Sequence, residues 1–319
     1  MMSKWVWPRS AWLAVAASLA LTLAACGRPP TTVIRVGALP MYETLPFFVA
    51  QQNGYFKAAG LNVQVQMFNA ALDRDTAMES GQLDVNVTEL LGAMVMAGGG
   101  FPTTVVAQIY QGQAYLLSAP HSSIRTVAQL AGVPVASAAN NVVEYDAYVL
   151  ATQNGLPAAQ FHITNIPNIP QRVATLLSGG VQAAVLTQPF AGEAIAGGAH
   201  VLATNGTTGV TAPSVIAVAP KFLQAHPAAV RAVLAAYQKA VLAINANPQQ
   251  YLALARQKGI VPANAPAGFQ LPHYPDLATP APATVQAVLA WAQMKGLLRH
   301  PVDAGTMITA DFLPASHGH

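Results

Sequence analysis

Charged residues and cysteine are scarce in this sequence, and the common catalytic and cofactor motifs are missing. Charged residues make up 8% of the 319 positions, and the formal net charge is +3. Lysine and arginine form no cluster, which argues against a nucleic-acid partner because binding to phosphates requires a concentrated positive patch. The chain contains no GxGxxG, no GxxxxGK followed by Ser or Thr, no GxSxG and no HExxH. Nothing in the sequence therefore indicates catalysis or a cofactor, and we expect neither.

The eight histidines do not form a metal-binding pattern. Only His317 and His319 are close to each other in the sequence. Because chain ends fray readily, we interpret residues 315–319 as a disordered tail and predict no metal site.

Long apolar stretches are also missing from most of the chain. Hydrophobic residues account for 53% of the sequence and the mean hydropathy is +0.38, partly because alanine is abundant. After Cys26, however, no uninterrupted apolar run reaches the roughly 18 residues that suggest a membrane-spanning helix. We therefore expect no membrane span in the chain after Cys26.

The first 25 residues have the composition of a secretory signal peptide. Lys4 and Arg9 precede an uncharged run rich in alanine and leucine at 11–25, which is short for a membrane span. The run ends in Leu-Ala-Ala-Cys, and Cys26 is the only cysteine of the chain. An odd cysteine in an exported protein requires an explanation.

This Leu-Ala-Ala-Cys segment resembles the lipobox of bacterial lipoproteins. The resemblance implies cleavage before Cys26 and lipidation of its sulfur, which would anchor the exported protein at the outer face of the cell membrane. The alternative is an ordinary signal peptide with an incidental cysteine. Cleavage removes two of the 15 basic residues and none of the 12 acidic ones, so the mature net charge would be +1 (13 − 12).

Strand and helix patterns alternate along the rest of the chain, which favours an α/β fold with largely parallel sheets. We expect strands at 33–39, 62–68, 83–87, 103–110, 114–119, 133–137, 161–164, 183–187, 200–203 and 212–220. We expect helices at 45–60, 73–81, 88–99, 123–132, 142–155, 170–180, 189–198, 226–247 and 283–298, with Asp73 and Thr88 as N-caps. The six prolines of 262–282 indicate a loop.

The mature length exceeds that of a typical single core, so two lobes are expected. The predicted organisation has a signal peptide at 1–25, a linker at 26–32 and a tail at 315–319. Lobe 1 comprises 33–118 plus 215–314, and lobe 2 comprises 119–214.

Several segments in this order resemble the solute-binding proteins of ABC importers, in the branch that handles sulfonates, taurine, nitrate and thiamine precursors. The resemblance covers nearly all of 33–314. It rests on VIRVGALP, LPFFVAQQNGYFKAAGLNVQV, SGQLDVNVTELLGA, VAQLAGVPVAS, NNVVEYDAYVLATQNGL, LLSGGVQAAVLTQPFA and AWAQMKGLL with a following FLP.

The resemblance implies a type II periplasmic-binding-protein fold, with two α/β lobes, a hinge and a ligand cleft between the lobes. In such sheets, ligands bind at the carboxyl ends of the strands. The sequence departs from the family pattern at Gln182 and Gln188, where many relatives carry an acid. These departures bear on the polar contacts that lobe 2 would make.

Two groups of residues are predicted to face this cleft. Tyr42, Glu43 and Thr44 follow the first strand, and Thr88 follows a strand at a helix start, where backbone N–H groups attract anions. In lobe 2, Asn140, Asn141, Glu144 and Tyr145 begin a helix, and Gln188 follows a strand. Each of them has an alternative structural role, as a solvated loop residue or a helix cap.

The expected function is capture of a small solute and its delivery to an ABC permease and its ATPase, by a monomer exported to the periplasmic or extracellular face of the membrane. Two acids in the cleft, Glu43 and Glu144, favour a ligand with hydrogen-bond donors, such as an amino-substituted heterocycle. The helix starts at Thr88 and Asn141 favour an oxyanion instead. The alternatives are an enzyme of the same fold, related to thiamine-pyrimidine synthesis, and a ligand-sensing subunit of a receptor.

Overall fold

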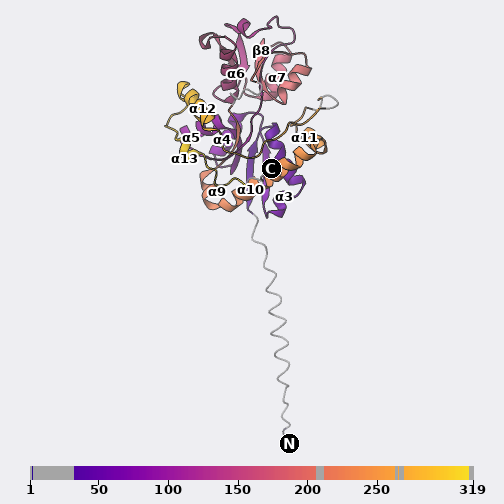
Figure 1. Ribbon diagram of the computed structural model, residues 1–319, viewed down its shortest axis with the longest axis vertical. Helices are drawn as coiled ribbons and strands as arrows, with labels where there is room; N and C mark the ends of the chain where they lie inside the picture. The colour runs from indigo at the N-terminus through magenta and orange to yellow at the C-terminus, as the bar shows by residue number, and fades with distance from the viewer. Residues whose placement is uncertain (1, 3–31, 206–211, 263–264, 266–268, 316–319) are drawn as a thin grey trace. The chain divides into compact units, whose positions relative to one another are not determined.

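The computed structural model describes Met2 and residues 32–205, 212–262, 265 and 269–315 of the chain. Cys26, the rest of the linker up to residue 31 and the His317–His319 pair lie outside the described residues, as does the predicted signal peptide apart from Met2. From Val33 onward the chain forms one compact unit. In this unit two groups of helices, each around its own sheet, form two α/β lobes (Figure 1).

The sheet of lobe 1 has five strands in the order β2-β1-β3-β10-β4. The strands are β1 (Val33–Ala38), β2 (Asn62–Met67), β3 (Val85–Glu89), β4 (Thr104–Tyr110) and β10 (Ser214–Val218). β10 runs antiparallel to β3 and β4, whereas β1 is parallel to β2 and β3. Valine and isoleucine dominate these strands, as expected for strands that are covered on both faces.

The sheet of lobe 2 has the order β7-β6-β8-β5-β9. The strands are β5 (Ala114–Ser118), β6 (Pro134–Ser137), β7 (His162–Asn165), β8 (Ala183–Thr187) and β9 (His200–Thr204). β5 is the antiparallel strand here. We expected β5 in lobe 1, but it pairs with β8 and β9, because only three residues separate it from β4 and the chain has already crossed to the second sheet.

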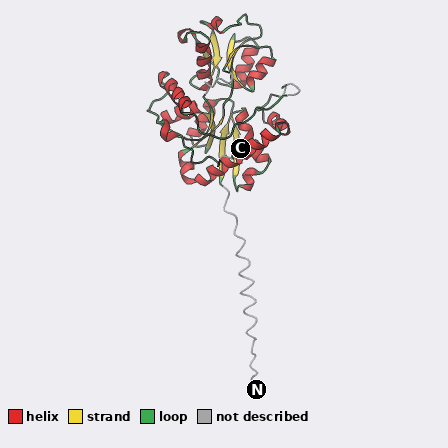
Figure 2. Ribbon diagram, in the orientation of Figure 1, coloured by secondary structure: helices red, strands yellow, loops and turns green. Residues whose placement is uncertain are grey.

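Helices flank the strands in both lobes (Figure 2). Lobe 2 contains α6 (Val142–Gln153), α7 (Ile169–Leu177) and α8 (Phe190–Ala196), with short 3-10 helices at Val127–Leu130 (η2) and Ala158–Gln160 (η3). The other helices are η1 (Tyr42–Thr44), α2 (Leu45–Gln52), α3 (Tyr55–Ala58), α4 (Ala71–Glu79), α5 (Leu90–Gly98), α9 (Pro220–Ala225), α10 (Pro227–Ala246), η4 (Pro248–Tyr251), α11 (Leu252–Gln257), α12 (Pro282–Met294) and α13 (Ala304–Met307).

Two of the expected helices differ in the structure, and the starts of two others are displaced. The helix expected at 45–60 is divided, because Gly54 adopts a left-handed conformation with φ of 72° between α2 and α3. The segment 123–132 forms only η2, whose start is fixed by a capping box between Thr126 and Gln129. The N-caps also differ: Thr88 lies in β3 and Glu89 precedes α5, while Asp73 lies in the first turn of α4.

The long helix α10 supplies much of the core of lobe 1. One apolar face of α10, at steps of three and four residues, is buried in the same cluster as β1 and α2. This face comprises Val230, Val233, Leu234, Tyr237, Val241 and Ile244. Among the described residues, α10 is the one helix whose length and composition would suit a membrane span. Burial of this face in the lobe identifies it as a core helix.

The two sheets are built to the same plan, so their positions can be compared one by one. In lobe 1 the first residue of β10, Ser214, pairs with the last residue of β3, Glu89. In lobe 2 the first residue of β5, Ala114, pairs in the same way with the last residue of β8, Thr187. α4 begins four residues after β2 ends (71 − 67), and α7 begins four residues after β7 ends (169 − 165). Each lobe therefore presents the same set of strand ends and helix starts.

Candidate functional site

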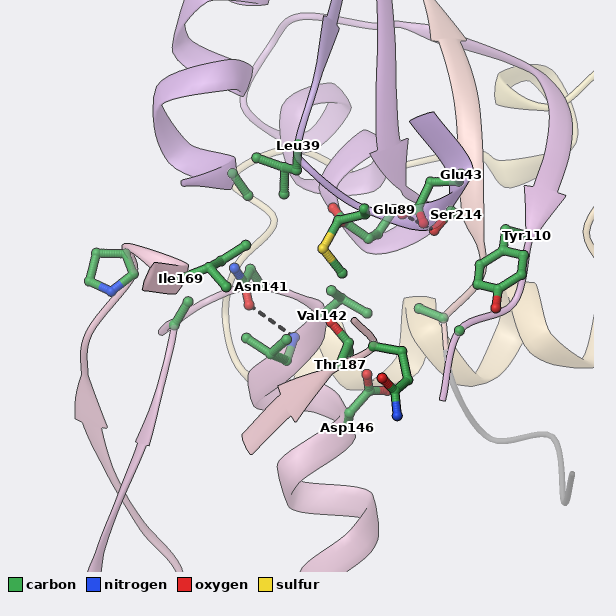
Figure 3. A pocket seen from close by; sticks show the side chains of 18 of the residues that line it. Leu39, Glu43, Glu89, Tyr110, Asn141, Val142, Asp146, Ile169, Thr187 and Ser214 are labelled. Carbon is green, nitrogen blue, oxygen red and sulfur yellow. Dashed lines mark hydrogen bonds between the residues drawn. The ribbon is translucent and has the colours of Figure 1, made fainter. Parts of the chain in front are cut away.

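A cavity lies between the carboxyl-end segments of the two sheets. Lobe 1 lines it with residues that follow β1 and β2 and with the ends of β3 and β4, and lobe 2 lines it with segments that follow β6, β7 and β8. In Figure 3, Glu43, Glu89 and Ser214 lie on one side and Ile169 on the opposite side, with Asn141 and Val142 between them. This is the place where open α/β sheets bind ligands.

The cavity is small. Its volume is about 60 Å³, whereas drug-sized ligands occupy pockets of roughly 300–1,000 Å³. In this conformation the cavity therefore fits a short solute of few non-hydrogen atoms.

The lobes touch each other beside the cavity. The backbone N–H of Ile169 in lobe 2 donates to the carbonyl of Asn69 in lobe 1 at 3.1 Å. Lys295, at the end of α12, forms an ion pair of 2.6 Å with Glu144 of α6, and α12 itself packs against α5. These direct contacts explain why the space between the lobes is narrow.

Glu43 is the predicted residue with the clearest position in the cavity wall. Its side chain is buried, and one carboxylate oxygen accepts a hydrogen bond of 2.9 Å from Ser214 Oγ at the start of β10. Tyr237 Oη donates a hydrogen bond of 2.9 Å to the backbone carbonyl of Glu43. Burial raises the pKa of Glu43 to about 7, against the opposing effect of its hydrogen bonds to the backbone and to Ser214. The side chain can therefore accept from a ligand when ionised and donate when protonated.

The other residues predicted in lobe 1 hold the wall in place from behind. The Tyr42 ring packs edge-on against Tyr110, and its carbonyl accepts from Tyr274 Oη at 2.9 Å. Thr44 Oγ1 donates to the Leu39 carbonyl at 2.7 Å. Tyr42, Thr44 and Thr88, which we expected to face the cleft, do not line the cavity and lie behind its wall.

Behind this wall, Arg74 of α4 is fully enclosed and fully partnered. Its guanidinium donates to Asp75 at 2.9 Å, to Glu89 at 3.0 Å, to Thr88 Oγ1 at 2.7 Å and to the Val87 carbonyl at 2.8 Å. Burial lowers the pKa of Arg74, but Asp75 and Glu89 outweigh burial and raise it. Thr88, which we expected to touch a ligand, is thus occupied by Arg74.

In lobe 2, Asn141 and Gln188 line the cavity as predicted. Asn141 caps α6, where its side chain accepts from Val143 N at 3.0 Å (Figure 3). Gln188 follows β8, and its side-chain oxygen accepts from Gly192 N at 3.2 Å. Both side chains combine a structural hydrogen bond with a position in the wall.

Glu144, Asn140 and Tyr145 lie elsewhere. Glu144 binds Lys295 and accepts from the backbone N–H of Asn140 at 2.6 Å, and it faces a separate cavity together with Asn140. The Tyr145 ring packs edge-on against Trp291 at 5.4 Å. The first turn of α6 points Glu144 toward α12, whereas the cavity lies on the side of Val142 and Asp146. Of the two glutamates that we expected to face a ligand, Glu43 lines this cavity and Glu144 faces the separate one.

Two buried ionisable residues that we did not predict complete the wall of lobe 2. Asp146 of α6 is 3% exposed, and its Oδ1 has no hydrogen-bond partner among the described residues. Burial raises the pKa of Asp146 well above its usual range, and the nearby Glu89 adds to the increase. Burial therefore favours the protonated form of this carboxyl group, which can donate a hydrogen bond.

Arg172 of α7 is the second of these residues. It is 2% exposed, its Nη1 donates to the Ile166 carbonyl at 3.1 Å, and its Nε has no partner among the described residues. Burial is the cause that lowers the pKa of Arg172 to about 10, so the group stays cationic at neutral pH. The sequence carries a signal for it, because Arg172 falls on the apolar face that Ile169, Val173 and Leu176 define.

Comparison with solved structures supports the fold. The periplasmic aliphatic sulphonate binding protein SsuA from Escherichia coli aligns with a TM-score of 0.72 and 20% identity, over 88% of this chain and 98% of that one. The periplasmic nitrate-binding protein NrtA from Synechocystis PCC 6803 aligns with a TM-score of 0.69 and 14% identity, over 90% of this chain and 88% of that one. The desulfurization enzyme DSZB also aligns, with a TM-score of 0.62 and 17% identity, over 88% and 97%. The predicted periplasmic-binding-protein fold is therefore confirmed.

Comparison of the sequence alone points to one family. No curated protein matches the chain. The family model described as NMT1/THI5 like matches residues 42–251, which is more than half of the chain and includes both walls of the cavity. The chain therefore belongs to the NMT1/THI5-like family.

Proposed function

We propose that this protein is the extracytoplasmic solute-binding component of an ABC importer, anchored to the membrane through a lipid on Cys26. The observation that carries the proposal is the small cavity between the strand ends of the two lobes, into which buried polar groups from both lobes converge. Sites of this form bind small molecules, since polar groups in an otherwise closed cavity fix the orientation of a ligand.

The proposed cycle is capture, closure and delivery. Ligand-driven closure requires that the solute binds the closed state more tightly than the open one. The contact of Ile169 with Asn69 and the ion pair between Glu144 and Lys295 join the two lobes beside the cavity. Hinge motion that breaks these contacts would open the cleft and release the solute to the permease.

An enzyme of the same fold is the main alternative, because the desulfurization enzyme DSZB shares the architecture. The described residues that line the cavity include no histidine and no cysteine. That composition supports binding without chemistry. Incubation of the bound solute with the protein, followed by mass analysis, separates the two functions: an importer component returns the solute unchanged.

Binding is tested with residues 27–319 and a library of short polar solutes in a thermal-shift assay. A solute at 100 times its dissociation constant should stabilise the folded protein by about 2.7 kcal/mol. Gly112 lines the cavity, and a Cβ added there meets only Tyr110, at 3.6 Å. Gly112→Trp should therefore fill the cavity and abolish the shift, whereas the matched control Gly112→Ala should keep it. A shift that survives Gly112→Trp would place binding elsewhere.

The anchor is tested in cells of a lipoprotein-forming bacterium. Cys26→Ser should move the protein from the membrane fraction to the soluble exported fraction. An unchanged membrane association would contradict lipidation at Cys26 and leave the binding proposal untouched.

A further inference from the structure

The two lobes carry a buried arginine at the same structural position. Arg74 is the fourth residue of α4, Arg172 is the fourth residue of α7, and both helices begin four residues after their strands end. The two arginines are 1% and 2% exposed. The strands before both helices also pair in the same way. Arg74 binds Thr88 and Glu89 at the end of β3, and Arg172 lines the cavity together with Thr187 at the end of β8.

The surroundings of these arginines differ in two residues. Arg74 has Asp75 beside it on the helix and Glu89 at the end of β3. The equivalent positions in lobe 2 hold Val173 and Thr187, the last residue of β8. Arg172 therefore lacks both of the carboxylates that neutralise Arg74, and no acid of the described residues forms an ion pair with it.

A buried guanidinium without a counter-ion is expensive, and proteins rarely keep one without a partner. Arg172 donates one hydrogen bond, from Nη1 to the Ile166 carbonyl. Its Nε has no partner among the described residues, and the residue lines the cavity. The missing partner is supplied most simply by an acidic group of the ligand, which a guanidinium binds through charge-assisted hydrogen bonds.

The lobe 1 wall of the cavity favours a different chemical group on the ligand. Arg74, Asp75 and Glu89 together carry one positive and two negative charges, and Glu43 adds a carboxyl group on the same side. In Figure 3, Glu43, Glu89 and Ser214 lie on the side of the view away from Ile169, and Ile169 lies one turn before Arg172 on α7. A purely anionic solute would meet repulsion there, whereas an amine or hydroxyl group would find acceptors.

We propose that Arg172 determines the specificity and orientation of the solute: the cleft takes a short molecule whose acidic group binds Arg172 and whose hydrogen-bond donor at the other end binds Glu43. This inference rests on the proposed solute-binding function. A cavity of about 60 Å³ suits a short acid, with two carbons between its ends.

A matched set of probes tests each end of the solute separately by calorimetric titration. β-Alanine and 2-aminoethanesulfonate carry both groups, propionate and ethanesulfonate carry only the acid, and propylamine carries only the amine. We expect both amino acids to bind most tightly, the plain acids about tenfold more weakly, and propylamine not at all. The carboxylate and sulfonate arms show which head group the site prefers.

Two variants assign the residues. Arg172→Gln should weaken binding of every acid by about 100-fold, and it should melt no lower than the wild type because it removes a buried unpaired charge. Glu43→Gln should remove the advantage of the amino acids over the plain acids. If Arg172→Gln does not fold, Arg172→Lys replaces it as the test. This variant keeps the charge but lacks Nε, and its affinity for acids should be about tenfold lower than that of the wild type.

The outcomes separate the inference from the proposed function. Propylamine that binds as tightly as β-alanine, or acids that bind Arg172→Gln as well as the wild type, would overturn the role of Arg172. A library solute that binds in the cleft without an acidic group would also overturn it and would leave the proposed function standing. If no solute binds at all, the proposed function itself is wrong.

Discussion

Arg74 and Arg172 occupy equivalent positions in the two lobes, but only Arg74 has its charge neutralised within the protein. Asp75 and Glu89 bind Arg74, while Val173 and Thr187 stand at those positions around Arg172. The same helix start thus holds a neutralised arginine in lobe 1 and an arginine without a counter-ion in lobe 2. The side chains around the arginine decide between these states, and the backbone does not.

A second pair of equivalent positions differs in the space available beside the strand. Gly37 in β1 corresponds to Ala136 in β6, since Gly37 pairs with the second residue of β3 and Ala136 pairs with the second residue of β8. A Cβ at Gly37 would lie 2.3 Å from Leu83 Cδ1 and 3.3 Å from Arg74 Cγ. Lobe 1 therefore requires glycine where lobe 2 accepts alanine.

The largest expected effect comes from removing the partnered arginine. Arg74→Met should lower the free energy of unfolding by about 3 kcal/mol or more, because Asp75 and Glu89 would remain as half-buried, uncompensated charges. Arg172→Met is the matched control and should leave stability unchanged or raise it. Urea unfolding at pH 7 measures both variants, and equal losses for the two would contradict the comparison.

The pH dependence of stability tests the carboxyl group on the wall of lobe 1. The pKa of Glu43 rises from 4.5 to about 7 on folding, so this group opposes folding increasingly as pH rises from about 4.5 to about 7. The full effect is about 3 kcal/mol, since each pKa unit corresponds to about 1.4 kcal/mol. Glu43→Gln should remove this fall, leaving a flatter profile in unfolding experiments across that window. A variant profile that runs parallel to the wild type would show that Glu43 is ionised normally.

Giving Arg172 a partner should make lobe 2 resemble lobe 1. Thr187→Glu places a carboxylate at the position equivalent to Glu89, and we expect affinity for acidic solutes to fall about 100-fold. Thr187→Gln is the control of matched size and should bind nearly as well as the wild type. If Thr187→Glu binds acids normally, Arg172 is not their anchor.

The glycine of lobe 1 offers a smaller test of packing. Gly37→Ala should destabilise the protein by about 1–3 kcal/mol, because the buried Leu83 side chain must move. Leu83→Val in the same chain should recover part of the loss by creating space. Additive losses in the double variant would show that Leu83 is not the obstacle.

The smallest effect is expected at the ion pair between Glu144 and Lys295. The Lys295 side chain is 36% exposed, so the pair should contribute at most about 1 kcal/mol. Glu144→Gln should leave solute affinity unchanged, in contrast to Glu43→Gln. A loss of affinity equal to that of Glu43→Gln would restore Glu144 as a ligand contact.

Pattern reasoning located most of the elements, and its errors have identifiable causes. The alternation of strands and helices predicted both sheets, because burial on both faces requires runs of apolar residues. The course of the chain near 114 could not be assigned from pattern, since β5 is as apolar as its neighbours in lobe 1. Glu43, Asn141 and Gln188 were placed in the wall because each follows a strand of its sheet. Glu144 was misplaced because its direction depends on the rotation of α6 and on the position of Lys295, some 150 residues away in sequence.

The sequence by itself determined the α/β architecture, the apolar faces of the helices and the strand ends that line the cleft, because these follow from local periodicity and from the direction of the chain. It also carries a signal for Arg172, which falls on the apolar face of α7. Only the tertiary structure decided that Arg74 is neutralised and Arg172 is not. That difference depends on the side chain at the end of a strand that is adjacent in the sheet and distant in sequence, Glu89 in one lobe and Thr187 in the other.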